Sequence, residues 1–376
     1  MGSPMKVALI YDMDACRGPT GVTRHALAQL DRLQKRPDVA LSLVSGRISQ
    51  PDGLVFWEGL GDLPRKEMPL RTRDMLRAWR FTDWPPAEWW AGSVDWVYAP
   101  AEYYVPTKSA RLAVTSHDVL QDVTLGGPRR RVLLSKVFGR ADTILSVSAF
   151  NTARLAEHYP AETKDKVAYV PNAADDLFFE PATAAERAGV RTDLGLPAGM
   201  PYLLSVANFQ PRKNLPRFVR AAGRLAEVAR GELSLVLLGD GDESGTLAIR
   251  EAAAAIGPKA VVKRPGYRQG KSLRAAYAEA SALVFPSTCE SFGIPAVEAM
   301  AQGLPVALAD STALPEVGGE AGWYFPPEDE GAMAAVLRDL LDRADERSRR
   351  AEAGLRVASG YRWDAANDRL VGALRG

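Results

Sequence analysis

The sequence predicts an α/β protein built from two doubly wound, parallel-sheet domains. Short runs rich in Val, Ile, Leu and Ala recur along the chain, separated by amphipathic stretches of helical length. These runs are continuously apolar rather than alternating, which is typical of strands buried on both faces of a parallel sheet. The pattern occurs twice, and 376 residues exceed the roughly 250–300 at which a single hydrophobic core stops growing.

The expected strands alternate with helices in both halves of the chain. They span residues 6–11, 39–45, 94–98, 111–116, 143–147 and 167–170, and then 202–207, 233–238, 260–263, 282–285 and 305–309. Helical stretches such as 214–230 and 271–281 are expected to form right-handed crossovers between parallel strands. The halves meet in a Pro- and Gly-rich break at 171–201, and two such sheets facing each other would leave a central cleft at the carboxyl ends of their strands.

Charge and composition exclude several classes of protein. The net charge is +1, so no global positive field indicates a nucleic-acid partner. The two cysteines, Cys16 and Cys289, cannot form a disulfide framework, and a reducing compartment fits them. No apolar run reaches the ~18 residues of a membrane span and no signal peptide is recognised, so a cytoplasmic protein is expected.

One segment of the second half, residues 284–306, joins a strand end, a loop and a helix start. Gly293 relieves the backbone of the loop, and Pro295 suits the first helical turn. The helix is expected to end before Gly303, which suits the position after a helix C-terminus. The sequence therefore predicts a helix N-terminus at the carboxyl edge of a parallel sheet.

Two carboxylates, Glu290 and Glu298, lie on either side of this helix start. Free backbone N–H groups at a helix N-terminus favour an anion such as a diphosphate. A carboxylate accepts two hydrogen bonds from vicinal hydroxyls, which sugars and riboses both present. From the residues alone the alternative stays open, especially for Glu298, that an acid in the first turn only interacts with the helix dipole.

The E-x7-E spacing, with Ser-Phe-Gly-Ile-Pro-Ala-Val between the glutamates, resembles the signature of the retaining glycosyltransferases of family 4, which have the GT-B fold. Other stretches resemble the same family, in the same order, along nearly the whole chain. They are His117–Asp118, Asp142–Ser148, Val170–Asn172, Arg212–Asn214, Pro315–Gly318 and Trp363. Within the family the chain resembles mannosyltransferases of surface polysaccharide assembly.

The resemblance implies two Rossmann-like domains, an acceptor domain at 5–180 and a nucleotide-sugar donor domain at 181–360, with a C-terminal helix at 361–376 that packs back towards the first. It implies the transfer of a hexose from GDP-mannose or a UDP-sugar to a glycan, lipid-linked or small-molecule acceptor, with no other cofactor. The alternatives are an NDP-sugar 2-epimerase of the same fold and a non-catalytic sugar-nucleotide-binding protein. A dehydrogenase is disfavoured, because the G-x-G-x-x-G fingerprint is missing.

Carried over residue by residue, the resemblance assigns the donor site. Glu290 contacts the hydroxyls of the donor sugar and Glu298 those of the ribose. The diphosphate and sugar are approached by the backbone N–H groups of Phe292, Gly293 and Ile294, while Gly266 and Tyr267 stand where the family encloses the nucleobase.

The resemblance also assigns the cations Arg212 and Lys213 to the diphosphate, whose negative charge grows as it leaves. Two cations at a helix start oppose the helix dipole and so indicate a nearby anion, although a solvated helix start is the alternative.

In the first half, His117 at the carboxyl end of a strand is expected to touch the donor sugar, with a structural histidine as the alternative. Gly18 and Gly21 correspond to a glycine loop for the acceptor or a phosphate, although here the two glycines are separated rather than adjacent.

No metal is expected. The two D-x-D sequences, Asp12–Asp14 and Asp240–Asp242, each follow a strand, where Asp and Gly form turns and caps, and enzymes that the chain resembles usually need no metal. The family is described by a front-face substitution, in which the departing phosphate accepts the acceptor's proton; that mechanism is adopted here as a hypothesis.

The region 60–140 is rich in arginine and tryptophan. A basic, tryptophan-rich surface would suit an anionic membrane that carries a lipid-linked acceptor. The alternative is that the tryptophans belong to the core and the arginines to a solvated face. Peripheral contact with the inner face of a membrane is therefore one option for this cytoplasmic protein.

Overall fold

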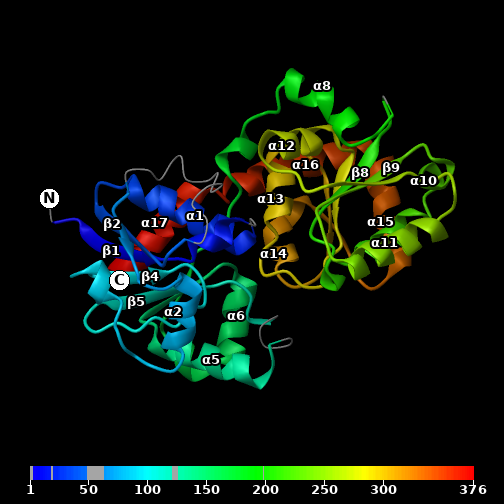
Figure 1. The fold of residues 1–376 in the computed structure, drawn as a ribbon. Coiled ribbons are helices and arrows are strands. Elements are labelled where there is room, and N and C mark those ends of the chain that lie inside the picture. Colours follow the sequence, from blue (N-terminus) through cyan, green and yellow to red (C-terminus); the bar gives the residue numbers. More distant parts are fainter. Residues whose placement is uncertain (1–2, 18–19, 49–62, 121–125, 198) are drawn as a thin grey trace. The chain divides into compact units, whose positions relative to one another are not determined.

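The computed structural model describes the chain except for residues 1–2, 18–19, 49–62, 121–125 and 198. The chain divides into two compact units: unit 1 comprises residues 1–172 and 363–376, and unit 2 comprises residues 173–362 (Figure 1). Each unit contains a parallel sheet with helices packed against it. The predicted fold class, two Rossmann-like parallel-sheet domains, is confirmed.

The described part of unit 1 forms a seven-stranded sheet in the order β3-β2-β1-β4-β5-β6-β7. Its strands are β1 (Met5–Ile10), β2 (Val39–Ser45), β3 (Arg65–Glu67), β4 (Trp96–Ala99), β5 (Arg111–Ser116), β6 (Thr143–Ser146) and β7 (Val167–Tyr169). Its longer helices are α1 (Gly21–Gln34), α2 (Thr72–Trp79), α5 (Gly127–Arg140), α6 (Ala149–His158) and α17 (Trp363–Arg375). Every strand predicted in this half is present, whereas the edge strand β3 was missed because its three residues are all charged.

Alternate residues of β1 face two different layers of helices. Ala8 and Ile10 belong to the same buried cluster as Trp79 of α2 and Phe138 of α5. The pleat directs the intervening residues to the opposite face. Two other helices, α1 and α17, contact each other and are drawn side by side in blue and red in Figure 1. The last helix of the chain is therefore part of unit 1.

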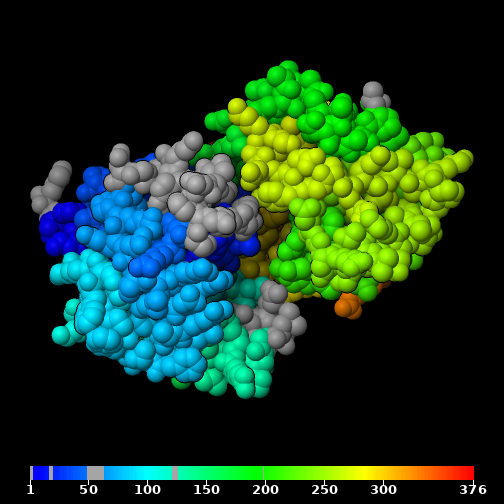
Figure 2. Space-filling view, in the orientation of Figure 1, coloured from blue at the N-terminus to red at the C-terminus, as the bar shows by residue number. Residues whose placement is uncertain are grey.

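Unit 2 forms a six-stranded sheet in the order β10-β9-β8-β11-β12-β13 within its described residues. Its strands are β8 (Tyr202–Val206), β9 (Ser234–Leu238), β10 (Val262–Gly266), β11 (Ala282–Phe285), β12 (Val306–Ala309) and β13 (Gly322–Phe325). Its helices include α8 (Ala184–Asp193), α9 (Leu215–Ala222), α10 (Ala226–Arg230), α11 (Glu243–Ala255), α12 (Gly270–Glu279), α13 (Ile294–Ala301), α14 (Leu314–Gly318), α15 (Glu330–Asp342) and α16 (Ala344–Ser359). The side of unit 2 shown in Figure 2 is formed mainly by the green to yellow part of the chain.

Two features of unit 2 differ from the sequence prediction. The helix expected at 214–230 is divided into α9 and α10 at Gly223, where a Cβ would lie 2.3 Å from a methyl carbon of Ile256. The close approach of these two segments therefore requires glycine. Strand β13 was not predicted, because its four residues follow a glycine-rich stretch without a longer apolar run.

The division between the units falls after Asn172, whereas the sequence suggested a boundary at 180/181. Ala174 forms a parallel bridge with Arg362, and Phe178 is buried in the core of unit 2. The stretch from 173 to 180 therefore belongs to unit 2. The acceptor and donor roles of the two domains, and the cleft between them, stay predictions.

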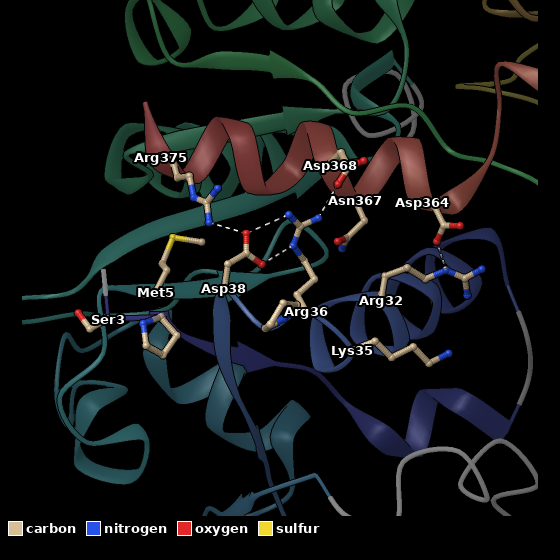
Figure 3. A pocket seen from close by; sticks show the side chains of 12 residues that line it. Ser3, Met5, Arg32, Lys35, Arg36, Asp38, Asp364, Asn367, Asp368 and Arg375 are labelled. Atoms are coloured by element: carbon tan, nitrogen blue, oxygen red, sulfur yellow. Dashed lines mark hydrogen bonds and ion pairs between the residues drawn. The ribbon is translucent and has the colours of Figure 1, made fainter. Parts of the chain in front are cut away.

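A cavity of about 880 Å³ lies in unit 1 beside the amino ends of β1 and β2 (Figure 3). Arg36 lies 2.9 Å from the carboxylate of Asp38 and 2.5 Å from that of Asp368, and Arg375 lies 2.5 Å from Asp38. These charged groups are paired with one another, and doubly wound sheets bind ligands at the opposite, carboxyl edge. We assign the cluster to the attachment of α17 rather than to a ligand.

Candidate functional site

The strand order of unit 2 reverses between β8 and β11. From β8 the chain builds outward through β9 and β10, and it then returns to place β11 on the other side of β8. Ligands of doubly wound sheets bind outside the carboxyl ends of the strands at this switch point. The segment after β8 carries Arg212 and Lys213, and the loop after β11 carries Glu290.

These three side chains form one charged cluster. The Nζ of Lys213 donates a hydrogen bond to Oε1 of Glu290, and a terminal guanidinium nitrogen of Arg212 lies 3.6 Å from the same oxygen. The side chains of Lys213 and Glu290 are only 11% and 10% exposed. Two cations therefore share one carboxylate at a nearly buried place.

The loop after β11 is fastened to the segment after β8. The backbone carbonyl of Arg212 accepts hydrogen bonds from the hydroxyl of Ser287 at 3.0 Å and from the backbone N–H of Thr288 at 2.8 Å. The guanidinium of Arg212 donates to the carbonyl of Cys289 at 2.9 Å. The side-chain amide of Asn214 donates to the carbonyl of Pro286 at 3.0 Å. Both sides of the cluster are thus held by backbone contacts as well as by charge.

Positive φ angles surround the cluster at Asn214 (57°), Thr312 (50°) and Gly293 (107°). A β-branched residue is rare in this region, and such backbone strain, of about 1–3 kcal/mol, persists where the surroundings hold it. The hydroxyl oxygen of Thr312 accepts a hydrogen bond from the N–H of Glu290 at 2.9 Å. A Cβ at position 293 would lie 2.7 Å from the side chain of Leu314. This position therefore requires glycine both for its positive φ and because a side chain would have no room. We therefore regard Thr312, which the sequence did not suggest, as a residue that positions Glu290.

The charge of Glu290 is stabilised despite its burial. Burial alone would raise the pKa of this carboxyl, but the charges of Lys213 and Arg212 outweigh it and the pKa lies below its usual value. Glu290 is therefore an anion at neutral pH. One carboxylate cannot balance two cations, so the cluster keeps an excess of positive charge.

Free donors lie next to this positive charge. The backbone N–H groups of Phe292, Gly293 and Ile294 precede or open α13, and they donate to no acceptor within the described residues. Such groups at a helix N-terminus favour an anion. The predicted combination of Arg212, Lys213, Glu290 and these N–H groups is thus brought together at one switch point.

Glu298 lies within α13 and is 1% exposed. The hydroxyl of Tyr277, from α12, donates a hydrogen bond to its carboxylate at 2.8 Å. The helix is buried on most sides, because α12, α14 and α16 all contact it. Tyr277 was not singled out from the sequence, since nothing in its spacing links it to Glu298. Binding of a ribose by Glu298 stays a prediction.

Gly266 and Tyr267 lie at the carboxyl end of β10, the edge strand of unit 2. Gly266 has a φ of 85° and its carbonyl accepts a hydrogen bond from the N–H of Gly239 at 3.2 Å. Tyr267 is 46% exposed. β10 is two strands from β8, about 10 Å across the sheet. Gly266 and Tyr267 therefore lie at the same carboxyl edge of the sheet as the charged cluster, but outside the cluster.

His117 follows β5 in unit 1 and is buried. Its Nε2 donates to the carbonyl of Pro100 at 2.8 Å, and its backbone N–H donates to the carboxylate of Glu102 at 2.5 Å. Its ring meets the edge of His25 at 4.9 Å. Burial, and then the neighbouring His117, lower the pKa of His25 to about 3, so that ring is neutral. These contacts are structural, and contact of His117 with the donor sugar stays a prediction.

Of the glycine loop, Gly18 lies outside the described residues. Gly21 opens α1, where the hydroxyl of Thr20 caps the helix by accepting from the N–H of Thr23 at 3.2 Å. Of the two D-x-D sequences, the second provides a cap as predicted: Asp242 accepts from the N–H of Gly245 at 2.8 Å at the start of α11.

Residues 187–357 match the family described as Glycosyl transferases group 1. The chain is 30% identical over 332 residues to a D-inositol 3-phosphate glycosyltransferase of Streptomyces scabiei, covering 82% of this chain and 73% of the relative. It is 29% identical over 291 residues to the O-antigen chain mannosyltransferase B of Escherichia coli, covering 75% and 74%.

Among solved structures the fold is similar to that of Anabaena Alr3699/HepE in complex with UDP and glucose. The TM-score is 0.75 at 15% identity, and the match covers 99% of this chain and 100% of the other. At this identity the similarity concerns the fold, which is GT-B.

The cluster predicts a pH dependence of unit 2 that Glu290→Gln should remove. Because the folded pKa of Glu290 is lowered, its contribution to stability is complete above the unfolded pKa of about 4.3 and is lost as the pH falls through the folded value. Removing the carboxylate leaves Lys213 and Arg212 without the negative charge that they share, which costs roughly 3 kcal/mol at neutral pH. Hydrogen exchange of peptides from β11 and α13, corrected for intrinsic rates, measures this difference.

The difference between wild type and Glu290→Gln should stay constant from about pH 7 to pH 5 and shrink below about pH 4. Glu328→Gln changes an exposed carboxylate of the same unit and should show no such difference. A difference that persists unchanged at low pH would mean that the charge of Glu290 does not stabilise the loop.

Proposed function

The chain belongs to the group 1 glycosyltransferases, and from this membership and the charged cluster of unit 2 we propose that it binds a nucleotide diphosphate sugar there and transfers the hexose with retention of configuration. The protein is an enzyme, a hexosyltransferase with the GT-B fold. The choice of donor, the assignment of residues and the mechanism are the parts proposed here.

One observation carries the assignment: at the switch point of unit 2, two cations share a single carboxylate beside backbone N–H groups that have no acceptor among the described residues. Lys213 and Arg212 are the cations, and the three successive N–H groups of Phe292, Gly293 and Ile294 follow Glu290 in the chain and lead into α13. A diphosphate supplies the missing negative charge and accepts from both kinds of donor. As the bond to the sugar breaks, negative charge grows on the diphosphate, so these preorganised donors stabilise the transition state more than the ground state.

Glu290 has two tasks in this proposal. Without donor it balances Lys213, and its contact with that ammonium fixes where the diphosphate will meet the cation. With donor bound, Lys213 turns to the diphosphate, and the carboxylate of Glu290 is released to accept hydrogen bonds from hydroxyls of the sugar. Thr312 and Ser287 keep the loop in place during this exchange.

Glu298 and the end of β10 complete the donor site in this proposal. The carboxylate of Glu298, oriented by Tyr277, binds the hydroxyls of the ribose. Gly266 and Tyr267 lie two strands away at the same sheet edge, a separation that fits a nucleobase at the far end of the nucleotide. The donor is GDP-mannose or a UDP-sugar: one relative is a mannosyltransferase, and a protein of similar fold was solved with UDP and glucose.

The proposed chemistry is a front-face substitution. The bond between the anomeric carbon and the phosphate oxygen breaks, the acceptor oxygen bonds to that carbon on the same face, and the acceptor's proton passes to the departing phosphate. A double displacement needs a carboxylate on the far face of the sugar. Glu290, the carboxylate of the cluster, is held by Lys213 and Arg212, which lowers its nucleophilicity.

The proposal also covers the class of acceptor and the contact of the protein with a membrane. The relatives' names contain an inositol phosphate and an O-antigen chain, so the acceptor is a glycan, a lipid-linked sugar or a small molecule.

No helix within the described ranges is long and apolar enough to cross a membrane. In unit 1 Phe81, Trp84 and Trp89 are 89%, 62% and 61% exposed, whereas Trp79 is buried. The rings of Trp84 and Trp89 contact each other, with centroids 4.7 Å apart, and these two side chains, called here the aromatic patch, suit peripheral contact with a membrane interface.

Nucleotide binding tests the donor site. A thermal-shift panel of UDP, GDP, ADP and their sugars should select one nucleotide, because stabilisation follows occupancy. Lys213→Ala should weaken that nucleotide about 10- to 150-fold, since a charge-assisted hydrogen bond contributes about 1.5–3 kcal/mol. Lys271→Ala removes an exposed lysine of α12 in the same unit and should leave the affinity unchanged. If both variants bind the nucleotide equally well, Lys213 does not contribute to the donor site.

Glu290→Gln tests the role of the carboxylate. Turnover should fall about 10- to 150-fold without being abolished, because only the hydroxyl contacts that strengthen in the transition state are weakened. Nucleotide affinity should stay equal or increase, because the carboxylate no longer competes for Lys213. NMR of the product should show retained anomeric configuration, and intact mass should show no glycosyl adduct. A trapped adduct on wild type would replace the front-face mechanism by double displacement.

Sedimentation with anionic vesicles tests the aromatic patch. Wild type should bind at low salt and lose binding as salt rises, and Trp84→Ala/Trp89→Ala should bind less at every salt concentration. Leu355→Ala removes an exposed apolar side chain of unit 2 and serves as the control. Absence of wild-type binding at low salt would exclude the membrane contact.

A further inference from the structure

The chain passes between the two units twice. On the unit 2 side of these passages lie residues 173–180 and 360–362, called here the linker pair. Ala174 forms a parallel bridge with Arg362, and its backbone N–H donates to the carbonyl of Tyr361 at 3.2 Å. The guanidinium carbon of Arg362 lies 3.8 Å from the centroid of the Phe179 ring, which is a cation–π contact. The two segments are therefore joined to each other by backbone and side-chain contacts.

The first segment of the linker pair is fastened to α12 and α13, which contact each other (Figure 1). The side-chain amide of Gln302, at the end of α13, donates to the carbonyls of Phe178 and Glu180 at 2.5 and 2.9 Å. The guanidinium of Arg274, which belongs to α12 and is 3% exposed, donates to the carbonyl of Leu177 at 3.0 Å. These hydrogen bonds fix the backbone of the segment against both helices.

Phe178 of this segment contacts a side chain that orients the proposed donor site. Its ring and that of Tyr277 meet edge to face, with centroids 5.9 Å apart and planes at 74°. Such contacts between buried rings are favourable and directional. The hydroxyl of Tyr277 in turn donates to the carboxylate of Glu298 at 2.8 Å. The ring of Phe178 therefore helps to fix where that hydroxyl points.

Tyr361, in the second segment, contacts the loop that leads into α13. Its ring and that of Phe292 also meet edge to face, with centroids 5.3 Å apart and planes at 83°. Gly293 has no side chain, so the turn around it is anchored by the buried side chains of Phe292 and Ile294. The backbone N–H groups of these three residues are the ones assigned above to the diphosphate and sugar. The ring of Tyr361 therefore supports the position of these N–H groups.

We propose that the linker pair orients the donor site of the transferase, with Phe178 and Tyr361 as positioning residues. Phe178 acts through Tyr277 on the carboxylate of Glu298, at the ribose. Tyr361 acts through Phe292 on the N–H groups at the diphosphate. The inference rests on the donor site proposed above and adds to it two residues that act without touching the ligand.

The two contacts should affect different kinetic constants. The hydroxyls of the ribose take no part in the reaction, so a contact with Glu298 stabilises the bound donor and the transition state equally. The diphosphate gains negative charge as it leaves, so the N–H groups contribute most in the transition state. Loss of the Phe178 ring should therefore raise KM, whereas loss of the Tyr361 ring should lower kcat.

Hydrolysis of the donor, with water in place of the acceptor, tests these roles. The probes are UDP-glucose and GDP-mannose, and the released UDP or GDP is measured. Phe178→Leu and Tyr361→Leu remove the ring but keep a large apolar side chain. Phe178→Leu should raise KM about 3- to 10-fold with kcat unchanged, as expected for one poorly oriented hydrogen bond. Tyr361→Leu should lower kcat about tenfold and change KM less than about twofold, because misplaced N–H groups stabilise the leaving diphosphate less.

Two further variants separate positioning from packing. Tyr361→Phe keeps the ring and removes only its hydroxyl, whose hydrogen bond to the carbonyl of Glu316 is long at 3.5 Å, and it should restore kcat. Tyr277→Phe removes the hydroxyl that reaches Glu298 and should raise KM as Phe178→Leu does. Because both changes affect the same contact, Phe178→Leu/Tyr277→Phe should have a KM no higher than about that of Tyr277→Phe alone.

Phe325→Leu is the matched control. It makes the same change at a buried phenylalanine of unit 2, in the edge strand β13, which contributes no residue to the proposed donor site. It should lower the melting temperature and leave KM and kcat unchanged.

The outcomes distinguish the two proposals. If no nucleotide shifts the melting temperature of wild type, the donor site fails and with it the premise of this inference. If wild type binds and hydrolyses a donor but Phe178→Leu and Tyr361→Leu change only the melting temperature, as Phe325→Leu does, the positioning roles alone are overturned. They are also overturned if Tyr361→Phe does not restore kcat, or if the effects of Phe178→Leu and Tyr277→Phe on KM add in full.

Discussion

The contact between Lys213 and Glu290 is the constraint around which the loops of unit 2 are arranged. Two nearly buried opposite charges cost desolvation energy unless their geometry is fixed, and breaking such a pair by removing one partner is strongly destabilising. The structure fixes it from both sides, through the positive φ of Asn214 and Thr312 and the glycine at 293. Because Arg212 adds a second cation, the arrangement is stable yet incompletely neutralised. A site of this kind is preorganised for an anion, so that binding of an anion requires little reorganisation energy.

Much of the fold could be predicted because buried parallel strands leave a strong signal in composition. β1, β8 and β11 are continuous apolar runs, and each was found within a residue or two of its bounds. β3 could not be found, since three charged residues on a sheet edge resemble a loop. The division at Asn172 reflects contacts of residues 173–180 with distant parts of unit 2, such as the bridge from Ala174 to Arg362 and the burial of Phe178 in the core, and no local sequence pattern records such contacts.

The charged half of the proposed donor site could also be predicted, because Arg212, Lys213 and Glu290 each follow a recognisable strand. Their partners were not. Tyr277 reaches Glu298 from another helix, and Thr312 reaches Glu290 across 22 residues. Hydrogen bonds between distant segments follow no spacing rule in the sequence. The charged residues could therefore be predicted, whereas the side chains that orient them are known only from the structure.

The placement of α17 has a consequence for the order in which the protein forms. Trp363, Leu370 and Leu374 are at most 1% exposed and lie within unit 1, yet they leave the ribosome after all of unit 2. Domains usually fold from the N-terminus during synthesis. Here the second unit can complete its core first, while the first 172 residues wait with the apolar side of α1 uncovered. A chain that stops before residue 363 would thus carry a finished C-terminal unit and an open N-terminal one, a target for chaperones and proteases.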